Sequence, residues 1–479
     1  MNRNSTAAVP LVVDLDGTLV WTDTLLESAL LLVRGRPLAI FLIVWWVLHG
    51  KLRLKAELAA RTTLDPQHLP WNQGLLEFLR HERDAGRQTV LATASRIEVA
   101  DPIAVHLGLF DDVVGSSQTL NLKGPFKRDE LVRRFGVGGF DYVGDSPADC
   151  PVWAASRVAH VAGHMKNLPR QALGPGTSEG RRFPAIGGRG WQVPRTLRVH
   201  QWVKNVLVFL PAILNHHLNF EILFRLGVAF LAFSLVASAM YVFNDLFDLE
   251  ADRRHPRKRF RPLAAGALSI PAGVALSLGA LITGFTLALW LGSLFAVFLA
   301  GYGSMVLAYS LFLKRKPILD VVILAVFYTA RIYAGGLAVH VRISPWLAQF
   351  SIFLFLSLAF VKRYSELHRL DATMPSDFKT RGYRVGDLAV VGQCGIATGF
   401  IAALVLALYV NAPEIQRLYP RPDFLWGICP VFVYWIARVW LVSFRGNMNE
   451  DPVLFASRDQ VSYISGFVIL VLAICAMVA

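Results

Sequence analysis

Three aspartates follow a long apolar run at a spacing suited to metal chemistry. Asp245, Asp248 and Asp252 are three and four residues apart, and they follow Asn244 and the apolar run 221–243. Positions i, i+3 and i+7 share one face of a helix. In proteins Mg²⁺ is typically held by one or two carboxylates together with phosphate oxygens of a substrate. The spacing therefore favours a metal–diphosphate site over the alternative, a solvated helix end.

Basic residues follow this cluster directly. Six arginines and lysines lie within residues 251–262, and Arg254, Lys258 and Arg261 are the candidates for contacting a negatively charged substrate. A basic loop at the end of an apolar span is also what the positive-inside rule produces. We expect residues 253–261 to border the opening through which a diphosphate enters.

A second set of polar residues lies near the N-terminus, mostly at the ends of short apolar runs. The segments DLDGT, VLATAS and YVGDSPAD each follow or contain such a run, which is typical of a buried strand. KGPFKRDEL lies between the second and the third of these segments. The polar residues at these places are Asp14, Asp16, Thr93, Lys127, Asp145 and Asp149.

In order and spacing, these residues resemble the four motifs of the haloacid dehalogenase (HAD) superfamily, over roughly residues 8–165. The resemblance implies an α/β Rossmann-like phosphatase domain with a small cap at about residues 20–88. Asp14 would attack a phosphorus atom and form an aspartyl-phosphate. Asp16 would protonate the leaving oxygen and then activate water.

The same resemblance implies which groups hold the metal ion and the phosphoryl oxygens. These two aspartates, with Asp145 and Asp149, are the candidate Mg²⁺ ligands, although Asp149 could instead orient the others. Thr93 and Lys127 would bind the transferring phosphoryl oxygens. Lys123 is a rival to Lys127, which we favour because it opens the helix-like segment KRDELVRRF.

The composition indicates a membrane protein. Of 479 residues, 54% are hydrophobic and 17% charged, which is too apolar for one soluble globule. The net charge of +14 does not indicate nucleic-acid binding, because the basic residues fall mostly in short loops between hydrophobic segments. The four cysteines are scattered, which predicts neither a disulfide framework nor a zinc site.

The chain divides into two parts of different texture. Residues 1–165 mix charged and apolar residues as a soluble α/β domain does, whereas residues 196–479 form a series of hydrophobic spans. Residues 166–195 are rich in Gly, Pro and Arg and are predicted to be a linker. The nine predicted spans are 202–217, 221–243, 270–289, 291–312, 318–338, 346–362, 388–410, 424–443 and 460–478.

The distribution of basic residues predicts the orientation in the cell membrane. Seventeen arginines and lysines lie in loops on the side shared with the N-terminal domain, against three in the opposite loops. The positive-inside rule then places the N-terminal domain in the cytoplasm. An odd number of spans would leave the C-terminus outside.

The acidic motif resembles NDxxDxxxD of the UbiA superfamily of membrane prenyltransferases, and nine spans agree with that fold. The resemblance is closer to the decaprenyl-phosphate phosphoribosyltransferase branch of this superfamily. It implies an all-α polytopic membrane domain of about nine transmembrane helices. The segments that carry it are QWVKNVLVFLP (201–211), NDLFDLEADRRHPRKRFRPLAAG (244–266), YSLFLKRKPILD (309–320), RIYAGG (331–336) and KRYSEL (362–367).

The resemblance also implies roles for the acidic residues. Asp245 and Asp248 would be catalytic and, with Asp252 and Asp320, would be candidate ligands of Mg²⁺, while Asn244 would contact substrate. Asp320 stands alone in the second acidic position, since VVIL follows it. A single carboxylate departs from the DxxxD second motif of ordinary members and resembles the phosphoribosyl branch.

Polar residues in or beside the spans are further candidates for binding substrate. Lys204 and Asn205 are candidates for the lipid phosphate. Arg331, deep in an apolar span, would either bind a phosphate or pair with Asp320. The remaining candidates are Tyr309, Lys314 and Lys362.

Together these features predict a two-part membrane enzyme. The resemblance implies transfer of 5-phosphoribosyl from phosphoribosyl pyrophosphate to a polyprenyl phosphate, a step of cell-wall biosynthesis, and removal of the 5-phosphate by the HAD part. The apolar run 38–48 is too short to span a membrane and is either interfacial or a buried cap helix. The alternatives are an aromatic prenyltransferase with an accessory phosphatase, a transporter, and a HAD part that is only a scaffold.

Overall fold

The computed structural model divides the chain into two compact units. The first unit comprises residues 1–199 and 241–279, and the second comprises 200–240 and 280–479. The described residues are 9–117, 120–163, 165, 167–185, 189–214, 219–371, 379–380, 382–448 and 451–477.

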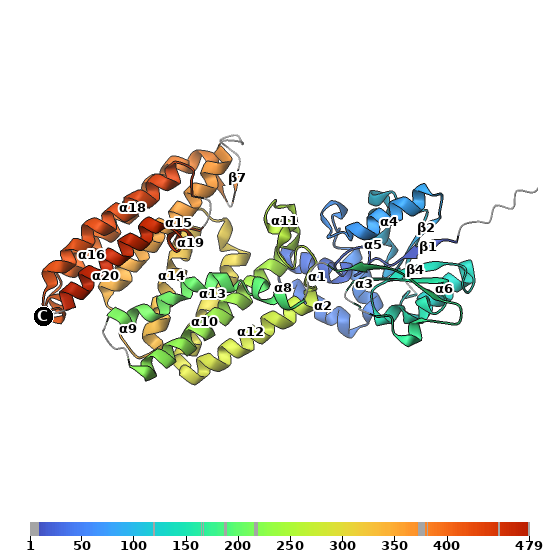
Figure 1. Cartoon of the computed structure of the whole chain (residues 1–479), viewed down its shortest axis with the longest axis horizontal. Coiled ribbons are helices and arrows are strands. Elements are labelled where there is room, and N and C mark those ends of the chain that lie inside the picture. The colour runs from blue at the N-terminus through green and yellow to red at the C-terminus, as the bar shows by residue number, and fades with distance from the viewer. Residues whose placement is uncertain are drawn as a thin grey trace, which may run out of the picture. The chain divides into compact units, whose positions relative to one another are not determined.

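A six-stranded parallel sheet forms the centre of the first unit, with strand order β3-β2-β1-β4-β5-β6. Figure 1 labels its strands β1, β2 and β4. β1 pairs with β2 on one side and with β4 on the other. The carboxyl ends of these three strands therefore meet at one edge, where ligands of such sheets bind. The strands are β1 (Leu11–Val13), β2 (Thr89–Arg96), β3 (Asp112–Ser116), β4 (Asp141–Gly144), β5 (Val158–Gly163) and β6 (Ser178–Pro184).

Helices cover both faces of this sheet. α4 (Gln73–Asp84) and α5 (Ile97–Leu107) pack on one face, and α6 (Pro125–Phe135) and α7 (Cys150–Trp153) pack on the other. The alternation within β1 shows this division, because Leu11 and Val13 join the first core while Val12 joins the second. The predicted α/β fold is confirmed.

The predicted linker contains part of this domain. β6 lies within residues 166–195 and pairs with β5, so the sheet extends past the predicted boundary at residue 165. A Cβ at Gly180 would lie 2.5 Å from Nδ1 of His160, which in turn accepts a hydrogen bond from the Arg181 amide at 2.9 Å. The glycine therefore permits close packing against β5, although its segment resembled a flexible linker in composition.

Three helices between β1 and α4 form the cap: α1 (Thr24–Gly35), α2 (Ala39–Leu48) and α3 (Lys51–Ala59). They share a small core that includes Trp46, which is 3% exposed. Most of α2 faces away from this core, since Phe41 and Leu48 are 71% and 78% exposed. This exposure argues against a buried cap helix and supports the interfacial interpretation of residues 38–48.

Eight helices among the described residues are long and apolar enough to cross a membrane, which confirms a polytopic membrane protein. In Figure 1, α16 and α20 lie alongside α18, and the contacts between these helices agree. The eight helices are α10 (Phe220–Phe247), α12 (Ile270–Leu291), α13 (Ser293–Leu311), α14 (Leu319–Ala338), α15 (Pro345–Asp371), α16 (Leu388–Val410) with the turn η7 (Val385–Asp387) before it, α18 (Ile428–Phe444) with the turn η8 (Pro422–Gly427) before it, and α20 (Gln460–Met477).

The first predicted span, 202–217, differs from the other eight. Its described residues belong to a 3₁₀ helix, η4 (Val199–Phe209), and to the short α9 (Leu210–Leu214), and residues 215–217 lie outside the described part. These helices are too short to be counted among the membrane-length helices. The external C-terminus, which was inferred from nine crossings, stays a prediction. Shorter elements used below are α8 (Arg189–Thr196), α11 (Leu249–Arg254) and α19 (Pro452–Ala456).

Candidate active sites

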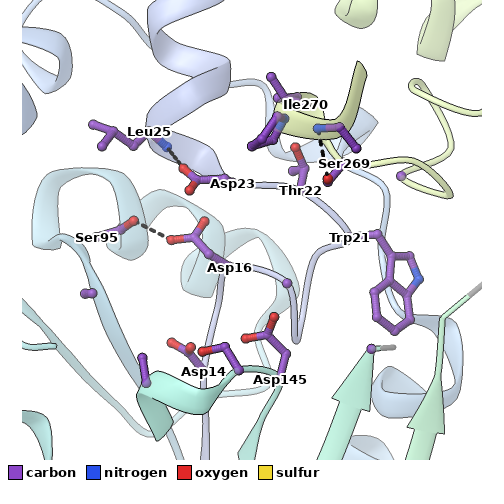
Figure 2. Close-up of a pocket in the computed structure, with 18 of the residues that line it drawn as sticks. Asp14, Asp16, Trp21, Thr22, Asp23, Leu25, Ser95, Asp145, Ser269 and Ile270 are labelled. Atoms are coloured by element: carbon purple, nitrogen blue, oxygen red, sulfur yellow. Dashed lines mark hydrogen bonds between the residues drawn. The ribbon is translucent and has the colours of Figure 1, made fainter. Parts of the chain in front are cut away.

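Three carboxylates gather at the carboxyl edge of the sheet. Asp14 directly follows β1, Asp145 directly follows β4, and Asp149 ends the 3₁₀ turn η2 (Pro147–Asp149). One oxygen from each lies within 4.8 Å of the others, which is close enough to share a metal ion. Figure 2 shows the Asp14 and Asp145 side chains beside each other at the base of the pocket. Among the described residues, this is the group of acidic side chains that meets this geometric condition.

The electrostatics of this group suit a divalent cation. Burial, reinforced by the neighbouring carboxylates and opposed by Lys127, raises the pKa of Asp14 to about 7. Burial and the charges of Asp14 and Asp149 raise the pKa of Asp145 to about 8. Such shifts mean that negative charge is concentrated without full compensation. An all-oxygen donor set of this kind fits Mg²⁺.

These pKa values predict a pH-dependent affinity for Mg²⁺. Asp14 and Asp145 must lose their protons to bind the metal, and their raised pKa values place that loss between about pH 6 and pH 9. We therefore expect the Mg²⁺ concentration for half-maximal binding to this site, measured by titration calorimetry, to fall as the pH rises through this window. The fall should reach about tenfold per pH unit for each proton displaced. The same half-maximal concentration at pH 6 and pH 9 would contradict this assignment of the ligands.

Lys127 reaches the carboxylates from the first turn of α6. Its Nζ donates to Asp14 Oδ1 at 2.8 Å and to the Tyr142 hydroxyl at 3.0 Å, and it lies 3.7 Å from Asp149 Oδ1. The carboxylates raise the pKa of Lys127 despite its burial, so the amine stays charged. This geometry supports Lys127 over Lys123 as the lysine that contacts a phosphoryl group.

Asp16 is held apart from the three metal candidates. Its carboxylate accepts hydrogen bonds from the Thr24 amide and from the Ser95 hydroxyl, each at 2.7 Å, and Figure 2 shows the bond from Ser95. These contacts orient the Asp16 carboxylate, and they do not support it as a metal ligand. Thr93 is buried, and its hydroxyl oxygen accepts from the Ser95 amide at 2.9 Å. Ser95 and Thr24 were not predicted as site residues from the sequence, although Ser95 stands two residues after Thr93.

The acidic motif of the membrane part lies in the first unit, and its helix is broken. α10 ends at Phe247 and α11 begins at Leu249, so the predicted single helical face is wrong at Asp248, whose φ and ψ are −99° and 14°. Asp245 and Asp252 are nevertheless joined, because Arg261 donates to them at 3.0 and 2.5 Å.

Guanidinium groups thus balance much of the charge in this motif. Arg198 also pairs with Asp245. Burial raises the pKa of Asp252, while Arg261 opposes the shift. Lys258, in the turn η5 (Lys258–Phe260), acts on the same carboxylate through its charge. Asn244, in the last turn of α10, is half-buried, and its carbonyl accepts from the Asp248 amide at 2.9 Å.

Arg254, a predicted substrate contact, pairs with two carboxylates of this chain. It pairs with Glu250 on its own helix and with Asp65 at 3.1 Å, and its side chain is half exposed. Arg253 beside it is buried and donates to Glu27 of α1 at 2.8 and 2.5 Å. These contacts belong to the first unit and connect the acidic motif to the cap.

In the second unit, two of the predicted lysines bind a carboxylate that was not predicted as a site residue. Asp451, directly before α19, accepts from Lys204 at 2.8 Å and from Lys362 at 3.2 Å. Tyr328 donates to its other oxygen at 3.3 Å. Burial opposes ionisation, but Lys362 and Lys204 hold the pKa of Asp451 well below its ordinary value. The ammonium groups of the two predicted lysines therefore lie together on Asp451, which is 247 residues along the chain from Lys204.

Asn205 and Arg331 form a second buried pair in this unit. The guanidinium Nε donates to Asn205 Oδ1 at 2.8 Å and is surrounded by aromatic rings, including Tyr302 and Tyr328 at 5.7 and 5.3 Å. A Cβ at Gly335 would lie 1.9 Å from the Val208 carbonyl, so this glycine lets α14 approach η4 closely. Arg331 thus has partners other than Asp320, the alternative left open by the sequence.

Asp320 is bound differently from a metal ligand. Its carboxylate and the Arg363 guanidinium are fully buried and form an ion pair, and the Tyr383 hydroxyl donates to it at 2.6 Å. Breaking such a pair would leave a buried charge uncompensated. The predicted role of Asp320 in binding Mg²⁺ is not supported by this arrangement. Tyr309 packs edge-on against Phe327, and Lys314, in the turn η6 (Leu313–Arg315), is half-buried.

Known protein families match both the membrane part and the N-terminal part of the chain. The UbiA prenyltransferase family model matches residues 206–476, and the haloacid dehalogenase-like hydrolase model matches residues 11–153. An uncharacterised protein of Sinorhizobium fredii, y4nM, is 37% identical over 96% of this chain and 90% of its own length. A decaprenyl-phosphate phosphoribosyltransferase of Mycolicibacterium smegmatis is 37% identical over 56% of this chain and 86% of its own length.

Among solved structures, a UbiA homologue from Archaeoglobus fulgidus with bound DMAPP and Mg²⁺ aligns with a TM-score of 0.45 and 16% identity. The alignment covers 60% of this chain and all of that one. The UbiA model alone matches more than half of the chain, and the HAD-like model matches the sheet domain that precedes it. The chain therefore belongs to the UbiA prenyltransferase family and carries a haloacid dehalogenase-like domain at its N-terminus.

Proposed function

We propose that the membrane part transfers 5-phosphoribosyl from phosphoribosyl pyrophosphate to a polyprenyl phosphate. The observation that carries this proposal is the similarity to a decaprenyl-phosphate phosphoribosyltransferase over 86% of that protein's length. The ion pair between Asp320 and Arg363 supports it, because this second acidic position then offers no free carboxylate for an isoprenyl diphosphate. In the reaction, a phosphate oxygen of the lipid attacks C1 of the ribose, and the bond from C1 to pyrophosphate breaks.

The residues divide between the two substrates of this reaction. Asp245, Asp248 and Asp252 would hold Mg²⁺ with the diphosphate, and the ion would neutralise the charge of the leaving pyrophosphate. Arg261, already in contact with two of these carboxylates, would bind a diphosphate oxygen. The lysines on Asp451 would bind the lipid phosphate as point charges.

The HAD domain would then remove the 5-phosphate from the lipid-linked sugar. Asp14 attacks the phosphorus atom, and Asp16 gives its proton to the ribose oxygen that leaves. Water, deprotonated by Asp16, then attacks the aspartyl-phosphate and releases inorganic phosphate. Lys127, at 2.8 Å from Asp14, would hold a phosphoryl oxygen near the nucleophile. Both reactions would take place on the cytoplasmic side, where the basic loops are predicted to lie.

Mass spectrometry of the lipids formed from polyprenyl phosphate and labelled phosphoribosyl pyrophosphate tests this proposal. We expect a phosphoribosyl lipid at early times and a ribosyl lipid later, with Mg²⁺ required for each. Full activity in excess chelator would contradict the scheme. A prenylated product from isoprenyl diphosphate and an aromatic acid, without labelled lipid, would instead identify an aromatic prenyltransferase.

The exposed helix α2 gives a prediction about contact with the membrane. Phe41→Ser should slow dephosphorylation of the lipid more than that of a soluble ester and should leave the melting temperature nearly unchanged, because Phe41 is exposed. Trp46→Ser is the matched variant on the buried side, and it should destabilise the domain by about 3–5 kcal/mol. Thermal unfolding and the two hydrolysis rates separate these outcomes. Equal slowing of the two substrates by Phe41→Ser would refute the interfacial role.

A further inference from the structure

The cavity above the phosphatase carboxylates is larger than a phosphate group needs. It has a volume of about 1270 Å³, and its polar base includes Asp14, Asp145 and Lys127. A small-molecule site typically occupies about 300–1,000 Å³. The cavity can therefore hold much more of a substrate than the phosphate that reacts.

Part of the wall of this cavity comes from the membrane part of the chain. Residues 266–272, Ala275 and Leu276, which precede and begin the membrane-length helix α12, line the cavity together with Leu25 and Leu54 of the cap. Their side chains are nearly all apolar, and Ser269 is the exception. Figure 2 shows Ser269 and Ile270 on the side of the pocket opposite Asp14 and Asp145. A polar base thus faces an apolar wall.

A close backbone contact holds this segment against the HAD domain. Gly266 has a φ of +72°, and a Cβ there would lie 2.3 Å from Cβ of Trp21 and 2.5 Å from its carbonyl oxygen. Trp21 belongs to the loop that follows the two catalytic aspartates. Any larger residue at 266 would therefore force the segment away from this loop.

A buried ion pair fixes the chain just before this segment. Arg253 donates to both carboxylate oxygens of Glu27, and its Nε donates to the Ala264 carbonyl at 2.9 Å. The side chains of Arg253 and Glu27 are 7% and 6% exposed. A bidentate pair of this kind positions groups with defined geometry. The wall is thus a packed part of the first unit.

We propose that residues 266–276 complete the phosphatase site and select phosphate esters that carry a long apolar chain. The phosphate lies on the carboxylates, and the chain leaves the cavity along the beginning of α12, where Ala275 is exposed and Leu276 half exposed. Leu278 continues this apolar surface outside the cavity and is 45% exposed. This inference rests on the proposed phosphatase activity and assigns to it a class of substrate, the lipid-linked phosphate monoester.

Ala275→Trp in the full chain, reconstituted in phospholipid vesicles, tests the wall. Its side chain would narrow the apolar side of the cavity and leave the carboxylates unchanged. We expect kcat/KM for a phosphate monoester of a long-chain alcohol to fall at least tenfold, while that for p-nitrophenyl phosphate changes less than about twofold. Leu289→Trp, at an exposed position near the far end of α12 and outside the cavity, should change neither value. Equal losses for the two esters, or no loss for either, would overturn the proposal.

Glu27→Gln gives an independent test, because it loosens the wall without adding bulk to the cavity. The preference for the long-chain ester over p-nitrophenyl phosphate should fall severalfold, while turnover of the small ester shows that the domain is folded. An unchanged preference would mean that the ion pair does not position the wall.

A series of phosphate monoesters of increasing chain length separates this inference from the proposed function. If kcat/KM rises with chain length but the phosphoribosyl lipid is not hydrolysed, the wall is correct and the proposed substrate is wrong. If the phosphoribosyl lipid is hydrolysed equally by the wild type and by Ala275→Trp, the proposed function is correct and the wall is wrong.

Discussion

Asp14→Asn should reduce phosphate release by about 10³-fold or more while phosphoribosyl transfer continues, so that a phosphorylated ribosyl lipid accumulates. The amide retains the shape of the carboxylate but cannot act as the nucleophile. Lys127 would keep the Tyr142 hydroxyl as a partner at 3.0 Å, so the local structure should survive. Lipid mass spectrometry together with assay of inorganic phosphate measures the two activities on one sample.

Asp129→Asn is the matched control for this variant. Asp129 lies on the exposed side of α6 and pairs with its neighbour Arg128, so the same chemical change there should alter neither activity. An unchanged product distribution in Asp14→Asn would mean that the HAD domain is a scaffold or acts on another substrate. Loss of transfer as well would show that the two activities depend on each other.

Much of the candidate site in the HAD-like domain could be predicted from the sequence because its residues follow strands. A short apolar run and the aspartate after it stay together in any parallel sheet, so Asp14 and Asp145 were expected and are found at one edge. The choice between Lys123 and Lys127 depends on where α6 begins, which the positive φ of Gly124 and the proline after it determine. Ser95 was missed because its contact with Asp16 spans 79 residues.

The candidate residues of the membrane part were harder to place because their partners are distant in the sequence. Helical periodicity put three aspartates on one face, but the backbone at Asp248 interrupts the helix, and Arg261 brings two of them together instead. Asp451 was not predicted as a site residue, although it binds two lysines from other elements. Such ion pairs depend on tertiary packing, which periodicity does not encode.

The roles of the cap and of the predicted linker also depend on tertiary contacts, so they could be predicted only in part. The run 38–48 is uniformly apolar, so its composition could not separate the buried Trp46 from the exposed Phe41. Gly180 lies in a Gly- and Arg-rich segment that resembles a linker, yet close packing against His160 needs a glycine there. In each case the sequence showed the residue type, and the tertiary contact decided its role.

Asp245→Asn should reduce the rate of phosphoribosyl transfer by about 10²-fold or more. It should leave the rate of hydrolysis of a small phosphate ester within about twofold of the wild type. The substitution removes one negative charge from the group that would hold Mg²⁺ and the diphosphate. Arg198 and Arg261, which this carboxylate now balances, would keep an oxygen acceptor at the same position. The loss should therefore arise from charge rather than from a rearranged loop.

Two further variants decide whether the acidic cluster acts as one unit. Asp252→Asn, on α11 but joined to Asp245 through Arg261, should cause a similar loss of transfer. Glu250→Gln changes the same helix at a half-buried carboxylate that pairs with Arg254, and it should leave transfer nearly intact. Labelled-lipid formation and small-ester hydrolysis, measured with a melting temperature for each variant, separate catalysis from stability. If a folded Asp245→Asn protein lost both activities, the two sites would not be independent. The ion pair between Arg253 and Glu27 would then link the two activities in addition to positioning residues 266–276.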